Sequence, residues 1–182
     1  MAICNALSAG LDKSCDNNAG GVNKIYVTDF DNVAFAGITI GAATSPQTGD
    51  WVDAITMTSG KFYEVKTNKN VCNFTETVAV DLANGTTFFN QVVTLELSKR
   101  ETTKRTFIDK LIAGQKQLRL IVLDSNGNYW LFGYTEGSYV TAIEGGSGTA
   151  KADKNGYTVT FTAMEPLQAY GVDPTAISSI IA

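Results

Sequence analysis

The sequence predicts a mainly β protein, an antiparallel β-sandwich or barrel with one flanking α-helix. Short runs of β-branched and aromatic residues recur along the chain, Asn-Gly and Gly-rich stretches separate these runs, and helical periodicity occurs in one segment. At 182 residues the chain can bury a substantial core within one domain. We expect an N-terminal arm at residues 1–23, a single β-rich domain at residues 24–172 and a C-terminal tail at residues 173–182.

Residues 1–23 are predicted to form an arm because they are small, polar and Gly/Asn-rich and follow neither the strand nor the helix period. The few apolar contacts that such a segment can make alone hardly offset the entropy it loses on becoming ordered. We therefore expect it either to stay mobile or to be ordered by a neighbouring subunit. Residues 41–50, with Pro46 and two glycines, have the composition of an exposed loop. The tail is either a second arm or a short helix that begins at Asp173 and Pro174.

The predicted strands are short runs that end at turn residues, and they cover residues 24–30, 52–58, 61–67, 71–82, 86–97, 118–123, 129–134 and 157–164. Asn84 and Gly85 predict a tight hairpin, because both residues tolerate the positive φ of a type I′ turn. Alternation predicts which side chains are buried, since successive side chains of a strand point to opposite faces. It assigns the core face to two sets, Val78, Val80 and Leu82, then Val93, Leu95 and Leu97. In residues 157–164 the larger apolar side chains alternate with threonines, and Pro166 ends the strand.

One helix is predicted over residues 100–113. Ser98 and Glu101 have the spacing of a capping box, and Gly114 can supply the left-handed C-terminal cap. Its apolar face consists of Phe107, Ile108, Leu111 and Ile112. The opposite face is basic and consists of Lys99, Arg100, Lys104, Arg105 and Lys110. This face is either solvated, paired with an acidic neighbour, or in contact with DNA.

The charge balance disfavours bulk binding of nucleic acid. The chain has fourteen Lys and Arg residues and eighteen Asp and Glu residues, which gives a formal net charge of −4. Only 18% of the residues are charged, so part of the surface is expected to meet a partner. No apolar run approaches the length of a membrane span, and no secretory signal is recognisable, so we expect no membrane partner.

Catalysis is not expected. The chain has no histidine, which removes the commonest general base and the usual zinc ligands. The pairs Asp29/Asp31 and Asp50/Asp53 lie beside turns, where aspartate is common for local hydrogen bonding. Asp124 begins a stretch that resembles a calcium loop, but a hairpin turn explains it better because the later ligands are missing. We therefore expect no enzyme activity, no cofactor and no metal.

The three cysteines, Cys4, Cys15 and Cys72, have no metal-binding or redox spacing. They are expected to be buried or spare thiols, and pairing of Cys4 with Cys15 stays open. The aromatic run Tyr129, Trp130, Phe132 and Tyr134 has two interpretations. It could stack sugars or bases, or it could be half core and half interface.

Two stretches resemble phage virion proteins. Residues 130–133, the glycines that follow and residues 153–166 resemble the closing strands of phage tail tube proteins. Residues 4–32, from the Cys-Asn-Ala-Leu opening to Asp29-Phe30-Asp31-Asn32, are similar to the starts of small structural proteins in phages of Bacteroidetes hosts. The resemblance implies a tail-tube-like fold, hexameric rings that stack into a hollow conduit for DNA, and a place in the virion after assembly in the cytoplasm of the bacterial host.

The implied partners are further copies of the chain, other phage structural proteins and DNA that passes through without specific binding. Candidate interface residues lie in the arm, in and beside the loop at 41–50, on the basic helix face and in the aromatic run: Cys4, Leu7, Leu11, Cys15, Pro46, Trp51, Lys104, Arg105 and Trp130. Two alternatives remain, namely another virion component, such as a head decoration, collar or ring protein, and a carbohydrate-binding β-sandwich.

Overall fold

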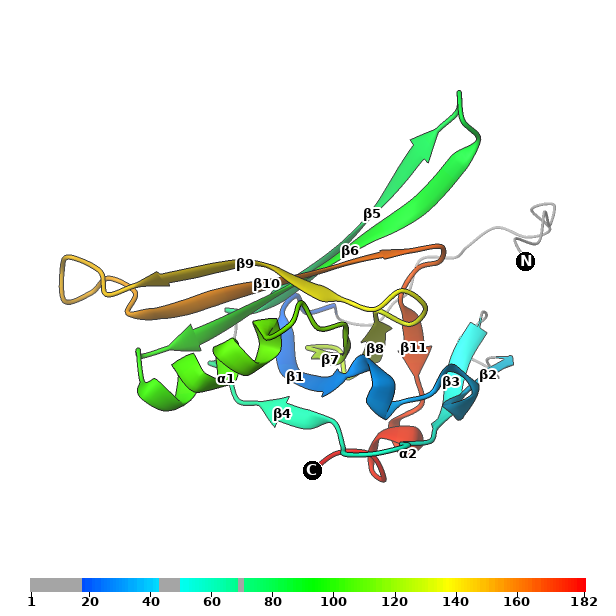
Figure 1. Cartoon of the computed structure of the whole chain (residues 1–182), viewed down its shortest axis with the longest axis horizontal. Coiled ribbons are helices and arrows are strands. Elements are labelled where there is room, and N and C mark those ends of the chain that lie inside the picture. Colours follow the sequence, from blue (N-terminus) through cyan, green and yellow to red (C-terminus); the bar gives the residue numbers. More distant parts are fainter. Residues whose placement is uncertain (1–17, 43–49, 69–70) are drawn as a thin grey trace.

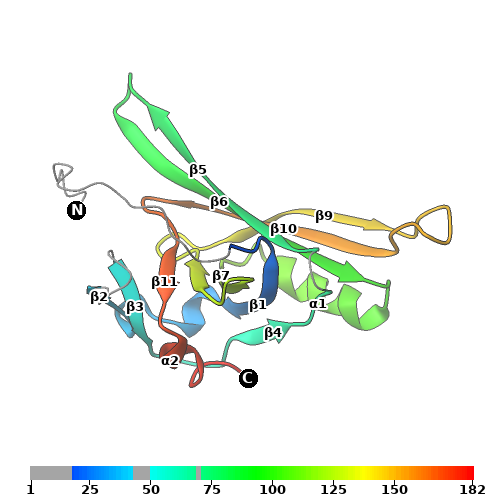
Figure 2. The same cartoon turned by 180° about the vertical axis from the view of Figure 1, so that it is seen from behind.

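A computed structural model of the chain describes residues 18–42, 50–68 and 71–182. The described chain is mainly β, with two sheets and one longer α-helix. The four-stranded sheet lies across one face of the seven-stranded sheet, as both views show (Figures 1 and 2). The prediction of a β-sandwich with one flanking helix is confirmed, and the described strands form no closed barrel.

The larger sheet has the strand order β2-β3-β11-β8-β7-β1-β4. Its strands are β1 (Val22–Asp29), β2 (Ile38–Ala42), β3 (Asp50–Ile55), β4 (Tyr63–Val65), β7 (Leu118–Asp124), β8 (Tyr129–Phe132) and β11 (Tyr170–Val172). The strand pairs are antiparallel except for β3 and β11, which pair in parallel. Two short 3-10 helices, η1 (Phe30–Asn32) and η2 (Phe35–Gly37), connect β1 to β2.

The smaller sheet has the order β5-β6-β10-β9 and is antiparallel throughout. Its strands are β5 (Asn73–Asp81), β6 (Thr86–Ser98), β9 (Tyr139–Gly146) and β10 (Gly156–Glu165). The alternation predicted for β10 is confirmed, since Tyr157, Val159, Phe161 and Ala163 are buried and the threonines between them point outward. Strand β9 was not predicted, because its glycines and mixed side chains give no clear period of two.

The core consists of two apolar clusters on opposite faces of the larger sheet. The first lies between the sheets and includes Leu95, Phe161 and Leu120. The second covers the other face and includes Ile121 and Val52. Because β7 is covered on both faces, its sequence is a nearly continuous apolar run rather than an alternating one.

The helix α1 (Thr102–Ile112) is shorter than the predicted 100–113, and the predicted capping box is wrong. Glu101 is the N-cap residue and its side chain makes no capping hydrogen bond, because the carboxylate instead pairs with two lysines. Ile108 and Leu111 are buried as predicted. Ile112, however, is exposed, since it lies at the last turn beyond the area that the sheet covers.

The tail packs against the body as a short helix, α2 (Pro174–Ile177), and does not extend as an arm. The Asp173 carboxylate accepts a hydrogen bond from the Thr175 backbone N–H, and proline occupies the first helical turn. Ile177 and Ile180 are buried in the second apolar cluster. At the other end of the chain, β1 begins at Val22, inside the segment predicted to be an arm.

Candidate self-assembly interface

The smaller sheet has two unpaired edges, β5 and β9, within the described part of the chain. The four strands alternate in direction, so these two edges run in opposite directions. Unpaired edges present free backbone N–H and C=O groups and are a risk for aggregation unless another chain covers them. The smaller sheet therefore ends in two unpaired edges of opposite direction.

The four strands of this sheet contain no lysine or arginine. The face turned away from the core carries threonine hydroxyls, among them Thr158, Thr160 and Thr162. Glu96 and Glu144 occupy the same sheet, and Glu96 pairs with Lys154 just outside it at 2.8 Å. This surface is polar and partly acidic, so it does not attract a phosphate backbone.

The hairpin of β5 and β6 projects well beyond the body of the molecule (Figure 1). The prediction that Val78, Val80 and Leu82 are buried is wrong, since they are 55%, 55% and 90% exposed. Val78 and Val80 continue the core-facing side of the sheet past the point where the second sheet ends, because they lie opposite Phe89 and Thr87 in the same register as the buried pairs. An apolar surface is thus left uncovered at the end of the hairpin.

The hairpin turn also differs from the prediction. Residues 82–85 form a four-residue turn, and only Gly85, with φ of 65°, has a positive φ. The predicted two-residue type I′ turn at Asn84 and Gly85 is therefore wrong. The Asp81 carboxylate accepts hydrogen bonds from the backbone N–H of Ala83 and Asn84 and from the Asn84 side chain. These bonds lower the pKa of Asp81 and keep a negative charge at the tip.

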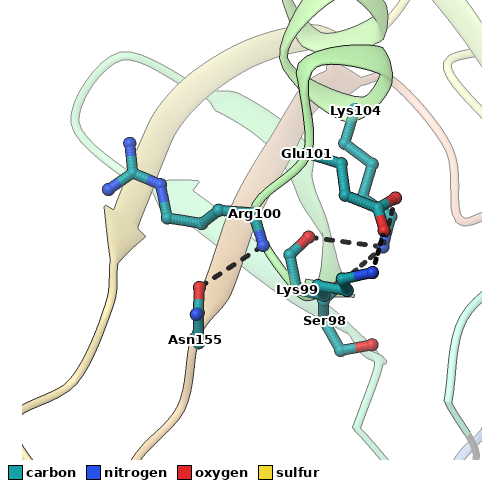
Figure 3. Close-up of polar contacts among 6 residues, drawn as sticks. All are labelled: Ser98, Lys99, Arg100, Glu101, Lys104 and Asn155. Carbon is teal, nitrogen blue, oxygen red and sulfur yellow. Dashed lines mark hydrogen bonds and ion pairs between the residues drawn. The ribbon is translucent and has the colours of Figure 1, made fainter.

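The opposite end of β6 is basic. The chain leaves β6 through Lys99, whose φ of 62° is unusual for a residue with a side chain. Glu101 lies between Lys99 and Lys104, at 2.8 Å and 3.7 Å, and Figure 3 shows both lysines directed toward this carboxylate. The hydrogen bond from Lys99 and the charge of Lys104 lower the pKa of Glu101.

Lys104 holds the start of α1 in place as well. Its ammonium group donates hydrogen bonds to the backbone carbonyls of Ser98 and Lys99. Arg100 is held from the neighbouring strand, because its backbone N–H donates to the Asn155 side chain at 3.3 Å (Figure 3). The basic residues at this end are thus ordered by local contacts.

A groove of about 320 Å³ lies beside this basic cluster, between β4, the end of β6 and α1. Its apolar side chains are Val65, Leu97 and Phe107, and its charged side chains are Glu64, Lys66 and Lys104. No ion pair in the described part of the chain involves Lys66. Glu64 pairs with Lys24 and Lys104 pairs with Glu101, so the groove combines apolar side chains with the positive charge of Lys66.

The structure describes four of the predicted interface residues, and they lie on α1, β3 and β8. Lys104 belongs to the basic end, and Arg105 is exposed on α1 beside Asp109. Trp51 is half-buried on β3, where its ring lies across Gly171. Trp130 is half-buried and donates a hydrogen bond to Asp124, so it belongs to the core side of the sheet. The other five, Cys4, Leu7, Leu11, Cys15 and Pro46, lie outside the described residues, as does the proposed pairing of the two cysteines.

The aromatic run does not form a flat platform for sugars. Trp130 packs against the first apolar cluster, whereas Tyr129 and Tyr134 pack against the second. Tyr134 is also covered by Phe35 and Tyr170, with ring centroids 5.1 Å and 5.0 Å away. These contacts favour the interpretation of the run as mostly core.

Two buried charged groups fix the loop that leads into β9. Arg119 is fully buried below the Phe30 ring and donates to the backbone carbonyls of Val33 and Tyr134. The Glu165 carboxylate accepts hydrogen bonds from the backbone N–H of Thr135 and Glu136. Burial raises the pKa of Glu165, although these donors oppose the change. The loop is therefore held on both sides.

The predicted turn at Asp124 is confirmed, because its carboxylate accepts from the backbone N–H of Asn126 and Asn128. No group of three or more Cys, Asp or Glu side chains among the described residues is arranged to hold a metal ion. Within the same residues, no helix has the length and apolar character needed to cross a membrane.

Comparison with known proteins gave no relatives. No protein-family model, no curated protein and no solved structure matched the chain.

Two surfaces of the structure, the exposed hairpin and the groove, were not predicted from the sequence. The groove joins three elements far apart in the sequence, β4, β6 and α1, so no local pattern could locate it. For the hairpin a weak signal exists. The apolar alternation continues to Leu82, directly beside the turn, where a strand usually becomes polar.

Proposed function

We propose that this chain is a structural subunit of a phage virion, a tail tube protein that forms stacked rings around a conduit for DNA. The observation that carries the proposal is the four-stranded antiparallel sheet with two open edges of opposite direction. The resemblance of residues 130–166 and 4–32 to virion proteins supports the same function.

The open edges suit a closed ring. Strands β5 and β9 lie at the two edges and run in opposite directions, because an even number of antiparallel strands separates them. If copies are related by rotation about an axis along the strands, β5 of one copy meets β9 of the next in antiparallel orientation. The sheet then continues from copy to copy and no edge stays open.

The composition of this sheet suits a conduit for DNA. In a ring of this kind one face of the continuous sheet lines the lumen, and the outward face of each copy carries threonines, with Lys154 held against it by Thr158 and paired with Glu96. Phosphates near such a wall are neither paired nor trapped, so DNA can slide. The other sheet and α1 lie on the opposite side and form the outer wall.

Negative-stain electron microscopy of the purified protein tests the proposal. Hollow tubes are expected at high protein concentration. Isolated rings would favour a collar, ring or head component, and strictly monomeric protein at millimolar concentration contradicts the proposal. A variant with proline at one edge position, Glu76→Pro on β5, should remain folded and stop ring closure, because Glu76 alternates with the residues that bond to β6 and proline removes its edge-facing N–H without breaking that ladder.

A matched control distinguishes edge pairing from general damage. Glu76→Ala removes the same side chain, with its hydrogen bond from the Ala169 backbone N–H, and keeps the backbone N–H of residue 76. This control should assemble like the unchanged protein.

A further inference from the structure

The two ends of β6 carry complementary surfaces. The hairpin end presents Val78, Val80 and Leu82 to solvent, and the other end has the apolar groove of Val65, Leu97 and Phe107. The surfaces are separated by the length of β6, which has 13 residues and therefore extends about 40 Å. A hairpin cannot reach the groove of its own chain, so a partner must supply the other half.

The charges of the two ends are also complementary. Residues 71–97 contain no lysine or arginine, and Asp81 places a carboxylate at the hairpin tip. Residues 99–110, at the other end, contain five basic and two acidic residues. Lys66 adds a further positive charge to the lining of the groove. Opposite charges favour end-to-end association of identical molecules over association of like ends.

We infer that the hairpin tip of one copy docks in the β4–α1 groove of another copy. Leu82 and Val80 then cover the apolar side chains of the groove, and Asp81 lies near Lys66. The contact is heterologous, because a different surface is used on each molecule, and it can repeat without closing. It extends the assembly along the strand direction.

This inference rests on the proposed function and specifies the contact that stacks one ring on the next. In the ring, strands lie along the axis, so the hairpin tips of all copies point to one side and the grooves open toward the other. The groove volume of about 320 Å³ is at the small end of the range for ligand pockets, roughly 300–1,000 Å³. It suits a few side chains at a hairpin tip rather than a whole folded element.

Cysteine cross-linking tests the docking directly. In a background with Cys4→Ser and Cys15→Ser, where only the buried Cys72 remains, Leu82→Cys and Thr103→Cys place one thiol at the tip and one in the groove. Mild oxidation should give a covalent ladder in multiples of 19.4 kDa that a reducing agent abolishes. The control combines Leu82→Cys with Ser178→Cys, an exposed position at the C-cap of α2.

The expected yield of cross-linked product is at least about tenfold higher for the groove pair than for the control, because docking raises the effective concentration of the two thiols. Equal yields, or tubes without a groove-specific ladder, overturn the inference and leave the proposed function standing. Monomers that form neither tubes nor a ladder overturn both. A ladder from chains that never close into rings supports the docking and contradicts the ring.

Discussion

Replacement of the exposed hairpin residues should stop assembly without unfolding the monomer. The variant is Val78→Thr, Val80→Thr and Leu82→Asn, which keeps the β-branched shapes on the strand. The three native residues are 55%, 55% and 90% exposed, which together equals about two fully exposed aliphatic side chains. Since burial of such a side chain is worth about 1.5–3 kcal/mol, covering the hairpin in an assembly contributes about 3–6 kcal/mol per copy.

A loss of that size corresponds to a factor of about 10² to 10⁴ in the association constant. Sedimentation measures it as a rise of at least about a hundredfold in the protein concentration needed for polymers. The monomer should lose no more than about 0.5 kcal/mol of unfolding free energy, because the substituted side chains contact solvent. Ile112→Thr is the control, since it removes a 41% exposed apolar side chain outside the hairpin.

Two results would refute this reasoning. If the triple variant polymerises at the same concentration as the unchanged protein, the hairpin is not covered in the assembly. If its monomer loses several kcal/mol of stability in urea, the three residues are packed in the monomer.

Three further predictions concern the fold and the arm. Leu111→Asp should cost about 3–5 kcal/mol, because it places a carboxylate in the core beneath α1; a cooperative urea transition at the native midpoint would count against this packing. Burial raises the pKa of Glu165 above 4.5, so its contribution to stability is complete at lower pH and is lost as the pH rises through the folded pKa. Glu165→Gln should therefore reduce the fall of the urea midpoint as the pH rises through the folded pKa of Glu165. If the midpoint of the variant falls as steeply as that of the unchanged protein, the pH dependence belongs to other groups. Deletion of residues 1–17 should leave a folded monomer that does not polymerise, and tubes of the shortened chain would show that the arm is not needed.

Elements with a strong local pattern could be predicted from the sequence. Strand β10 was predicted because Val159 and Phe161 alternate with threonines and Pro166 ends the run. The nearly continuous apolar run of β7 predicted a strand, and the second cluster explains why it is apolar on both faces. The helix was placed correctly to within two residues because Ile108 and Leu111 share one face.

Burial could not be predicted in the same way. Val78 and Val93 follow the same alternation, yet Val93 is 1% exposed and Val78 is 55% exposed. Alternation fixes which side chains share a face, but whether another element covers that face depends on where the second sheet ends. The capping box failed for a related reason, because Lys99 and Lys104 compete for the Glu101 carboxylate.

The candidate interface was only partly predictable. The sequence identified Lys104 as part of a basic cluster, and the structure shows that cluster beside an apolar groove. The open edges of β5 and β9 follow from strand order, which local patterns do not contain. Trp130, chosen as an aromatic on a strand, is instead half-buried against the core.

Electron microscopy of concentrated, purified protein tests the central claim most directly. Hollow tubes whose walls contain a continuous sheet, with β5 of each copy beside β9 of the next, are the expected result. A protein that stays monomeric at all concentrations, or polymers in which both edges remain open to solvent, would contradict the claim that this chain completes its fold by pairing with copies of itself.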